Sequence, residues 1–291
     1  MPPQTQGQAT LIGSSAILLW ATLATLTTLA GSLPPFQLMA MAFTLAFIIG
    51  LVLWLKQGHP IGQHLRLPLS VWLLGIYGLF GYHFLYFMAL RRAPAVEASL
   101  IAYLWPLLIV LLSALLPGEK LRWFHIIGAV IAFIGAALLV TGGESLTFEP
   151  AYTLGYGLAL LCAFTWSSYS VLSRRFGTIP TDAVGAFCGV TAILAAFCHL
   201  IFETTVWPVG WEWLAVLGLG LGPVGTAFYT WDYGVKQGNI RVLGAFAYAA
   251  PLLSTLLLIT LGLAQPTGAL MLACLFIVGG ALLASADSLR R

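Results

Sequence analysis

Residues 98–116 read ASLIAYLWPLLIVLLSALL, an uncharged and largely apolar run that only Pro106 interrupts. A helix that crosses a bilayer needs about 20 mostly apolar residues. Basic residues stand a few positions before and after the run, as expected where a helix leaves the membrane. The stretch therefore predicts a transmembrane helix over residues 94–116.

The rest of the chain repeats this pattern. Of its 291 residues, 60% are hydrophobic and 7% are charged, whereas soluble domains average roughly 25% charged residues. This composition excludes an ordinary soluble enzyme, a nucleic-acid-binding protein and a disordered scaffold. Turn and charge signals divide the chain into ten predicted spans, at residues 9–31, 34–55, 68–90, 94–116, 123–141, 154–176, 181–202, 211–235, 240–262 and 266–286. The predicted fold class is an all-α integral membrane protein with ten transmembrane helices.

The basic residues are distributed unevenly between the two ends of these spans. Lys and Arg in short loops favour the cytoplasmic side of a membrane. Arg91 and Arg92 fall at one end. The other ten of the 12 basic residues fall at the end that holds both termini; they are Lys56, Arg66, Lys120, Arg122, Arg174, Arg175, Lys236, Arg241, Arg290 and Arg291. Both termini are therefore expected in the cytoplasm, and the net charge of +3 reflects this orientation and gives no reason to expect a nucleic-acid partner.

Two halves of the chain, residues 1–145 and 146–291, resemble each other. Aromatic residues and prolines recur about 145 residues apart, with Trp20, Tyr103 and Pro106 matched by Trp166, Tyr248 and Pro251. Five spans in each half is an odd number, so the second half must enter the membrane from the opposite face. Inverted repeats of this kind are a transporter architecture in which substrate binds near the membrane midplane. We therefore expect two inverted five-helix repeats with a site between them.

Polar and aromatic residues at mid-membrane depth are the candidates for substrate contact. A buried Tyr or Trp needs a hydrogen-bond partner, so it should face the bundle interior or a wet cavity. Helical spacing places Ser99, Tyr103 and Pro106 on one face, with Val110 one turn further. The candidates for substrate binding are Trp20, Tyr82, His83, Ser99, Tyr103, Trp166, Tyr169, Tyr229 and Tyr248. Packing within the core is the alternative interpretation for each of them.

Pro106 and Pro251 lie in the middle of predicted helices. Proline removes a backbone hydrogen bond and kinks a helix, often for purely structural reasons. Because the two prolines match between the halves, we interpret them as hinges or cavity-shaping bends.

Ionisable residues inside a membrane are by default functional. All nine acids fall in a loop or within about one turn of a span end; they are Glu97, Glu119, Glu144, Glu149, Asp182, Glu203, Glu212, Asp232 and Asp287. Only His83 lies clearly inside a span, where it would either bind substrate or hydrogen-bond a neighbouring helix. The sequence thus lacks the carboxylate relay of a proton pump, and we expect transport to be facilitative or weakly coupled.

No motif indicates an enzyme, a metal site or a cofactor. Residues 220–225 spell GxGxxG, but they lie in a span, contain Pro223 and lack an acidic residue about 20 positions further on. Gly218 and Gly222 fit better a small-residue face for helix packing. The cysteines lie in apolar segments without CxxC or His spacing, and we interpret them as buried thiols; they are Cys162, Cys188, Cys198 and Cys274.

These features resemble the drug/metabolite transporter superfamily, EamA type, over nearly the whole chain. The resemblance rests on ten spans in two halves, a Trp early in spans one and six, and a Pro in spans four and nine. Further motifs are similar to those of aromatic amino acid exporters in this superfamily. They are Ala9 to Gly13 with Leu19 and Trp20, Glu97 with Tyr103 to Pro106, Trp166 with Tyr169, and Gly238 and Asn239 leading to Tyr248 and Pro251.

The resemblance implies a bacterial inner-membrane exporter of aromatic amino acids, or of similar small amphipathic metabolites, that works by alternating access. It implies a basket-like bundle whose central cavity is lined mainly by spans one, three, four, six, eight and nine. The expected partners are a small-molecule substrate and the lipid bilayer, with no cofactor. His83 stands where relatives are expected to carry an acid. A permease of broader metabolite or drug specificity and a channel-like pore are the alternatives, and the sequence does not indicate an oligomeric state.

Overall fold

The computed structural model describes residues 5–286 apart from 59, 119, 264, 266 and 267, and this part of the chain forms helices and loops without a strand. Eight of the ten predicted spans coincide with helical stretches that are long and apolar enough to cross a bilayer. These stretches are Gln6–Leu29 (α1, α2), Pro35–Gln57 (α3), Leu69–Leu90 (α5, η1, α6), Ala95–Leu115 (α7, α8, η2), Trp123–Thr141 (α9), Thr181–Phe202 (η5, α11), Glu212–Gln237 (α12, η6, α13) and Ile240–Thr260 (α14, α15). The chain is a multi-pass membrane protein, as its composition predicts.

The two remaining predicted spans also fold as helices. Residues 154–176 correspond to α10 (Thr153–Ser173), and residues 266–286 correspond to α16 (Gly268–Ala284). The 17 residues of α16 fall short of the about 20 that a straight crossing needs, and α10 is rich in Ser, Thr and aromatic residues. The short segments α4 (Ile61–His64), η3 (Pro150–Tyr152) and η4 (Arg174–Phe176) lie in the connections.

Several of the long stretches are interrupted. Glycine-containing π-helical turns, one of which also contains a proline, divide two of them, and two others break at a pair of turn residues, Tyr103–Leu104 and Ala247–Tyr248. The bounds of the pieces are α1 Gln6–Ala21, α2 Leu23–Leu29, α5 Leu69–Ile76, η1 Tyr77–Gly81, α6 Tyr82–Leu90, α7 Ala95–Ala102, α8 Trp105–Leu112, η2 Ser113–Leu115, η5 Thr181–Ala183, α11 Val184–Phe202, α12 Glu212–Leu221, η6 Gly222–Thr226, α13 Ala227–Gln237, α14 Ile240–Phe246 and α15 Ala249–Thr260. Such π-helical turns often mark functional sites.

Close glycine contacts hold the bundle together. A Cβ atom on Gly234 would lie 2.5 Å from the Cα of Gly13, so α13 and α1 touch backbone to backbone. α3 and α11 approach in the same way, since a Cβ on Gly50 would lie 2.7 Å from the Cα of Gly185. Small residues permit this approach in membranes, where van der Waals packing holds helices together.

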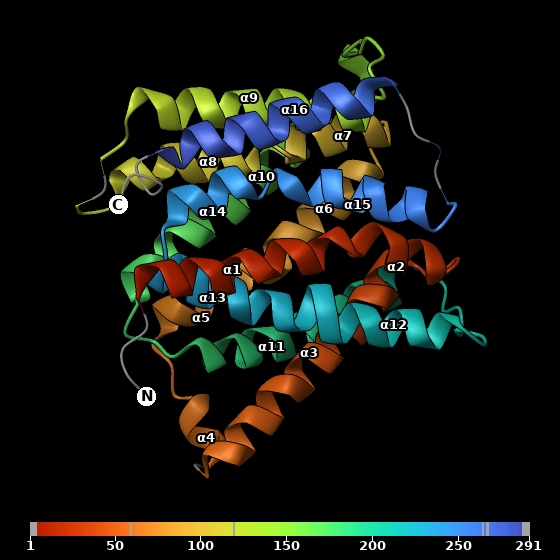
Figure 1. Ribbon diagram of the computed structural model, residues 1–291. Helices are drawn as coiled ribbons and strands as arrows, with labels where there is room; N and C mark the ends of the chain where they lie inside the picture. The colour runs from red at the N-terminus through yellow and green to blue at the C-terminus, as the bar shows by residue number, and fades with distance from the viewer. Residues whose placement is uncertain (1–4, 59, 119, 264, 266–267, 287–291) are drawn as a thin grey trace.

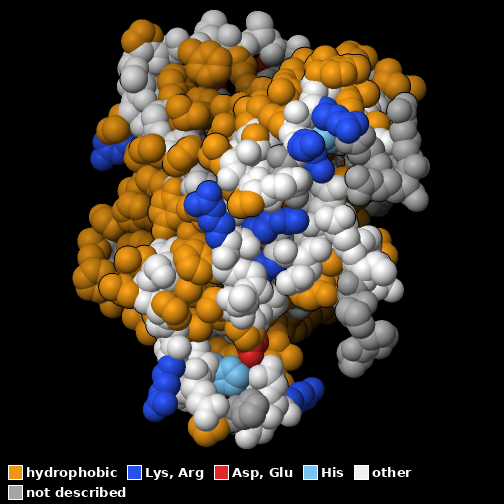
Figure 2. Space-filling model, turned by 90° about the vertical axis from the view of Figure 1, so that its left-hand side faces the viewer, with side chains coloured by type: hydrophobic (Ala, Val, Ile, Leu, Met, Phe, Trp, Pro, Cys, Tyr) orange, Lys and Arg blue, Asp and Glu red, His pale blue; other side chains and the backbone are white. Residues whose placement is uncertain are grey.

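The two ends of the bundle differ in charge. The helices run roughly side by side, and the start of α1 and the end of α16 lie at the same end (Figure 1). Lys and Arg side chains gather on this end (Figure 2), which we name the basic end. Its described members are Lys56, Arg66, Lys120, Arg122, Arg174, Arg175, Lys236 and Arg241, whereas Glu119, Asp287, Arg290 and Arg291 lie outside the described residues.

Candidate functional site

A cavity of about 640 Å³ lies between the helices. Its rim includes the exposed residues Thr28 and Pro35, at the end of α2 and the start of α3, together with Leu90 at the end of α6. These positions lie at the end opposite the basic end. The cavity therefore opens at that end.

Six of the nine predicted binding residues line this cavity. They are Trp20, Tyr82, His83, Ser99, Tyr103 and Trp166. They come from α1, α6, α7, α10 and the break after α7, so segments far apart in the sequence converge on one space. The lining further includes Tyr86, which shares a span with Tyr82, and Phe43, Phe87, Trp105 and Phe228, which the sequence did not single out as binding residues.

A cluster of aromatic rings closes the cavity toward the basic end. The ring centroid of Trp20 lies 5.8 Å from that of Trp166, 6.0 Å from that of Trp105 and 5.0 Å from that of Trp231. Phe228 lies 5.6 Å from Trp166. We call Trp20, Trp105, Trp166, Phe228 and Trp231 the ring floor. Edge-to-face pairs at these distances add to the stability that burial provides.

The helix break at Tyr103–Leu104 explains why Trp105 was missed. In a continuous helix, residues two apart point about 200° from each other, so Tyr103 and Trp105 could not share a face. With the break between α7 and α8, both line the cavity. Beyond the break, Pro106 and Val110 are buried and do not line the cavity, which agrees with the core-packing alternative for this face.

His83 lines the cavity, and its ring is held by a hydrogen bond within its own helix stretch. Its Nδ1 lies 2.7 Å from the carbonyl oxygen of Leu79. Since a carbonyl only accepts, Nδ1 must carry the proton, and in the neutral ring Nε2 is then an acceptor. Phe43 and Phe228 pack around the imidazole, with centroids 5.2 Å and 6.0 Å away.

The remaining polar groups of the cavity are neutral. The hydroxyls of Tyr86 and Ser99 lie 3.0 Å apart and bond to each other. The indole N–H of Trp20 donates to the carbonyl of Pro223, in the π-helical turn η6. Within the described part of the chain, no Asp, Glu, Lys or Arg lines the cavity. The site thus combines aromatic surface with uncharged donors and acceptors.

The three other predicted binding residues lie away from the cavity. Tyr229 donates its hydroxyl to the carbonyl of Ala46, 3.0 Å away. Tyr248 is fully buried, and its hydroxyl accepts the backbone N–H of Leu107 at 3.1 Å. Tyr169 packs behind Trp166, at a centroid distance of 5.3 Å, and lines a separate small chamber.

Asp232 and Lys236 form an ion pair whose burial the sequence did not indicate. Asp232 was expected within about one turn of the end of a span, but it is the middle residue of α13 and only 2% exposed. Its carboxylate lies 2.8 Å from Nζ of Lys236 and accepts the hydroxyl of Thr181 at 2.9 Å. The segments η4 and η5 and the helix α10 pack against α13 and cause this burial, and hydropathy does not report such packing.

The thiols and histidines suggest no metal centre. Among the described residues, no three His, Cys, Asp or Glu side chains gather in a way that could hold a metal ion. The cysteines are free thiols; Cys162, Cys188 and Cys198 are buried and Cys274 is partly buried.

Comparisons with known proteins agree with this architecture. The sequence profile of the EamA-like transporter family matches residues 8–141 and again residues 153–286. A protein of Ancylobacter novellus named aromatic amino acid exporter YddG is 55% identical over 96% of this chain and 98% of its own length. An Escherichia coli protein of the same name is 27% identical over 96% and 97%. A crystal structure with 54% identity superposes with a TM-score of 0.93, covering 99% of this chain and 100% of that chain.

Proposed function

Because the chain belongs to the EamA-like transporter family, we propose that it exports aromatic amino acids or similar small amphipathic metabolites across the bacterial inner membrane. As a member of this family it is a transporter and not an enzyme. The observation that carries the substrate proposal is the ring-lined, uncharged cavity of about 640 Å³. A relative with 55% identity whose name is aromatic amino acid exporter supports it.

The lining suits an aromatic amino acid in chemical terms. The rings of Trp20, Tyr103 and Trp166 offer faces for stacking. An ammonium group can donate to Nε2 of His83 and lie over ring faces. The hydroxyls of Ser99 and Tyr82 can hydrogen-bond a carboxylate. A zwitterion carries no net charge, so an uncharged site is compatible with it.

We also propose ten spans in two inverted halves, residues 1–145 and 146–291, with both termini in the cytoplasm. The helices α10 and α16 would supply the spans beyond the eight candidates. The family profile matches the chain twice, which supports two related halves. The position of the basic end supports a cytoplasmic location for the termini.

The proposed mechanism is alternating access. The cavity opens at the end opposite the basic end, which would be the release side of an exporter. At the basic end, Arg174 donates to the carbonyls of Val235 and Gly238, and the N–H of Asn239 donates to Thr10. These bonds and the ring floor would have to part for substrate to reach the cavity from the cytoplasm. With uncharged lining, we propose facilitative or weakly coupled transport.

Counterflow of a labelled amino acid panel in proteoliposomes tests the function. We expect saturable exchange of Phe, Tyr or Trp, and loss of that exchange in Trp166→Ala. Exchange of drugs or unrelated metabolites at equal rates would favour a permease of broader specificity, and ionic current would favour a channel. Strong concentration of substrate under an imposed proton gradient would contradict facilitative transport.

A further inference from the structure

The ion pair of Asp232 and Lys236 stands on α13, within the stretch Glu212–Gln237 that can span a membrane. Only 3% of the Asp232 side chain and 7% of the Lys236 side chain are exposed. Removing both charges from water costs several kcal/mol per ion, so apolar residues of similar volume would often stabilise the fold equally well. An ionisable pair inside a membrane domain is therefore a candidate for function.

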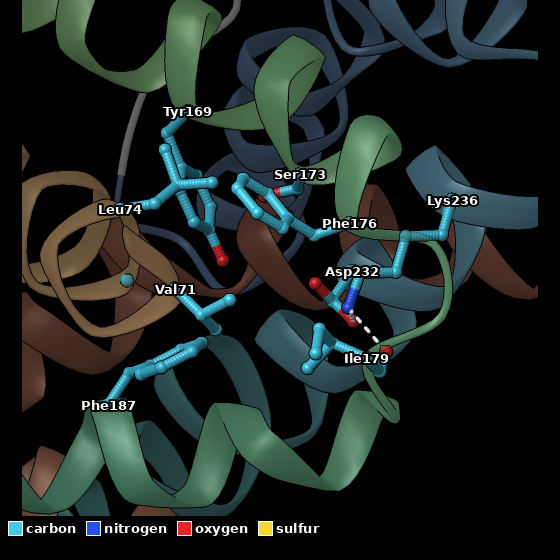
Figure 3. A pocket seen from close by; sticks show the side chains of 10 residues that line it. Val71, Leu74, Tyr169, Ser173, Phe176, Ile179, Phe187, Asp232 and Lys236 are labelled. Atoms are coloured by element: carbon cyan, nitrogen blue, oxygen red, sulfur yellow. Dashed lines mark hydrogen bonds and ion pairs between the residues drawn. The ribbon is translucent and has the colours of Figure 1, made fainter. Parts of the chain in front are cut away.

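The pair lines a small chamber that is separate from the main cavity (Figure 3). Phe176 and Ile179 lie beside the ion pair, and the carbonyl of Ile179 accepts a hydrogen bond from Lys236 (Figure 3). Val71, Leu74 and Phe187 form an apolar wall across the chamber, and Tyr169 and Ser173 of α10 complete its lining. In Figure 3 the hydroxyl of Tyr169 and the head groups of Asp232 and Lys236 point toward this common space. With a volume of about 10 Å³, the chamber has room for roughly one water molecule.

The chamber lies in line with the main cavity, on the side of the basic end. The ring of Tyr169 touches that of Trp166, which belongs to the ring floor and lines the main cavity. Trp231 of the ring floor directly precedes Asp232. Lys236 stands in the last turn of α13 and belongs to the basic end. A substrate that passes between the basic end and the main cavity along this line meets the ion pair before the ring floor.

The chemistry of the chamber complements an amino acid zwitterion. The main cavity holds no formal charge, whereas the chamber holds one charge of each sign, 2.8 Å apart. Lys236 can pair with a carboxylate and Asp232 with an ammonium group, while the apolar wall faces a side chain. A purely structural tie is the competing explanation, because Lys236 also donates to the carbonyl of Ile179 and Asp232 accepts from Thr181.

We propose that Asp232 and Lys236 form an inner subsite that binds the ammonium and carboxylate groups of a zwitterionic amino acid. In the state described here, the two side chains pair with each other and the subsite is collapsed. When α13 separates from the segment 174–183, the substrate replaces the contact between them. The proposal rests on amino acid transport as the proposed function.

The test compares three ligands that differ in one charged group. Tryptophan carries both groups, tryptamine lacks the carboxylate, and indole-3-propionate lacks the ammonium. Each is used as an inhibitor of labelled tryptophan exchange in proteoliposomes. We expect Lys236→Met to reduce the preference for tryptophan over tryptamine at least fivefold. The preference for tryptophan over indole-3-propionate should change little, because both carry the carboxylate. Asp232→Asn should reduce the preference over indole-3-propionate by a similar factor.

Two control variants separate binding from structure. Lys56→Met removes a basic-end lysine outside the chamber. Asp182 directly follows Thr181, and its carboxylate lies 3.2 Å from Nδ1 of His64. Asp182→Asn disrupts this ion pair, and Asp182 does not line the chamber. Both controls should keep the ligand preferences of the wild type. If Asp182→Asn changes them as much as Asp232→Asn does, the pair acts as a structural tie and the proposal is overturned.

A double variant keeps the test valid if a single substitution unfolds the protein. Asp232→Asn combined with Lys236→Met leaves no unpaired buried charge, and it should lower both preferences at least fivefold. If a folded, transporting double variant changes the two ligand preferences by less than this, the subsite proposal is overturned while the proposed transport function stands. If the wild type exchanges no aromatic amino acid, the proposed function fails first, so the two failures are distinguishable.

Discussion

The two helix breaks of this protein follow the same sequence pattern but lie in different surroundings. Tyr103 precedes Pro106 by three residues, and Tyr248 precedes Pro251 by the same spacing. Tyr103 lines the main cavity. Tyr248 is fully buried, and its hydroxyl accepts the N–H of Leu107 in the first turn of α8. Tyr248 at the second break thus hydrogen-bonds the backbone next to the first break, whereas Tyr103 at the first break faces the cavity.

This difference has a physical origin in the backbone. A break in a membrane helix leaves amide groups that must find partners, because the bilayer core contains no water to hydrogen-bond them. The hydroxyl of Tyr248 satisfies Leu107, directly after Pro106. The second break therefore supplies a hydrogen bond to the first, and Tyr103 remains available to a ligand while Tyr248 does not.

The largest expected effect follows from removing the buried tyrosine. Tyr248→Ala deletes a fully enclosed ring and leaves the amide of Leu107 without its acceptor. Replacing a buried aromatic residue by Ala typically costs about 3–5 kcal/mol. We expect a marked fall in the thermal unfolding midpoint of the purified protein in detergent, and only a small fall for Tyr103→Ala. Equal destabilisation by both variants would contradict the assigned difference between the breaks.

Transport per folded protein should fall more in Tyr103→Ala than in Tyr248→Ala. Tyr103→Ala removes a ring from the cavity wall, and we expect tryptophan exchange to fall at least tenfold, which corresponds to about 1.4 kcal/mol. Tyr156→Ala replaces a partly buried tyrosine outside the cavity and serves as the matched control. Exchange rates per folded protein are measured in proteoliposomes. Normal transport by Tyr103→Ala would remove the first break from the substrate site.

The spans could be predicted from the sequence because hydropathy and flanking charges act locally along the chain. The predicted fifth span, residues 123–141, coincides with α9, and the seventh, residues 181–202, with η5 and α11. Helical periodicity, by contrast, assumes an unbroken helix. Beyond Leu104 it grouped Pro106 and Val110 with Ser99 and Tyr103 and left out Trp105, whereas in the structure Trp105 lines the cavity and Pro106 and Val110 do not.

The site could be predicted in part. Depth along a span identified Trp20, Tyr103 and Trp166, but depth does not tell which side of a helix faces the cavity. The sequence equivalence of Tyr248 to Tyr103 made it a binding candidate, whereas the packing around it is different. The spacing of Asp232 and Lys236, four residues apart on a helix, was a signal for an ion pair. Its burial depends on α10, η4 and η5, which pack against α13, and could not be read from that spacing.

A smaller effect is expected from the hydroxyl of Tyr248 alone. Tyr248→Phe keeps the ring and removes the acceptor of the Leu107 amide. An unsatisfied buried donor costs about 1–3 kcal/mol, and membrane hydrogen bonds average about 0.6 kcal/mol in measured cycles, so we expect a loss near 1 kcal/mol. Tyr103→Phe, compared by the same detergent unfolding assay, should leave stability unchanged. A stable Tyr248→Phe would show that Leu107 finds another partner.

The smallest expected effect separates cavity shaping from hinge motion at the two prolines. Pro106→Ala restores an N–H and allows α7 and α8 to join. Tyr103 and Trp105 would then point about 200° apart, and one of them would leave the cavity. We expect the half-saturating tryptophan concentration in counterflow to rise about threefold, by analogy with modest losses of single ring contacts.

Pro251→Ala should change substrate affinity less than Pro106→Ala does. After the second break the cavity is lined by Ala250 and Ser254, which are four residues apart and share a face in a continuous helix. Joining α14 to α15 would therefore leave both in place. If the prolines act as hinges instead, both variants should lower the maximal exchange rate equally and leave half-saturation unchanged. A change in the half-saturating concentration for Pro106→Ala alone would indicate that Pro106 shapes the cavity, whereas equal losses of maximal rate in both variants would indicate that both prolines act as hinges.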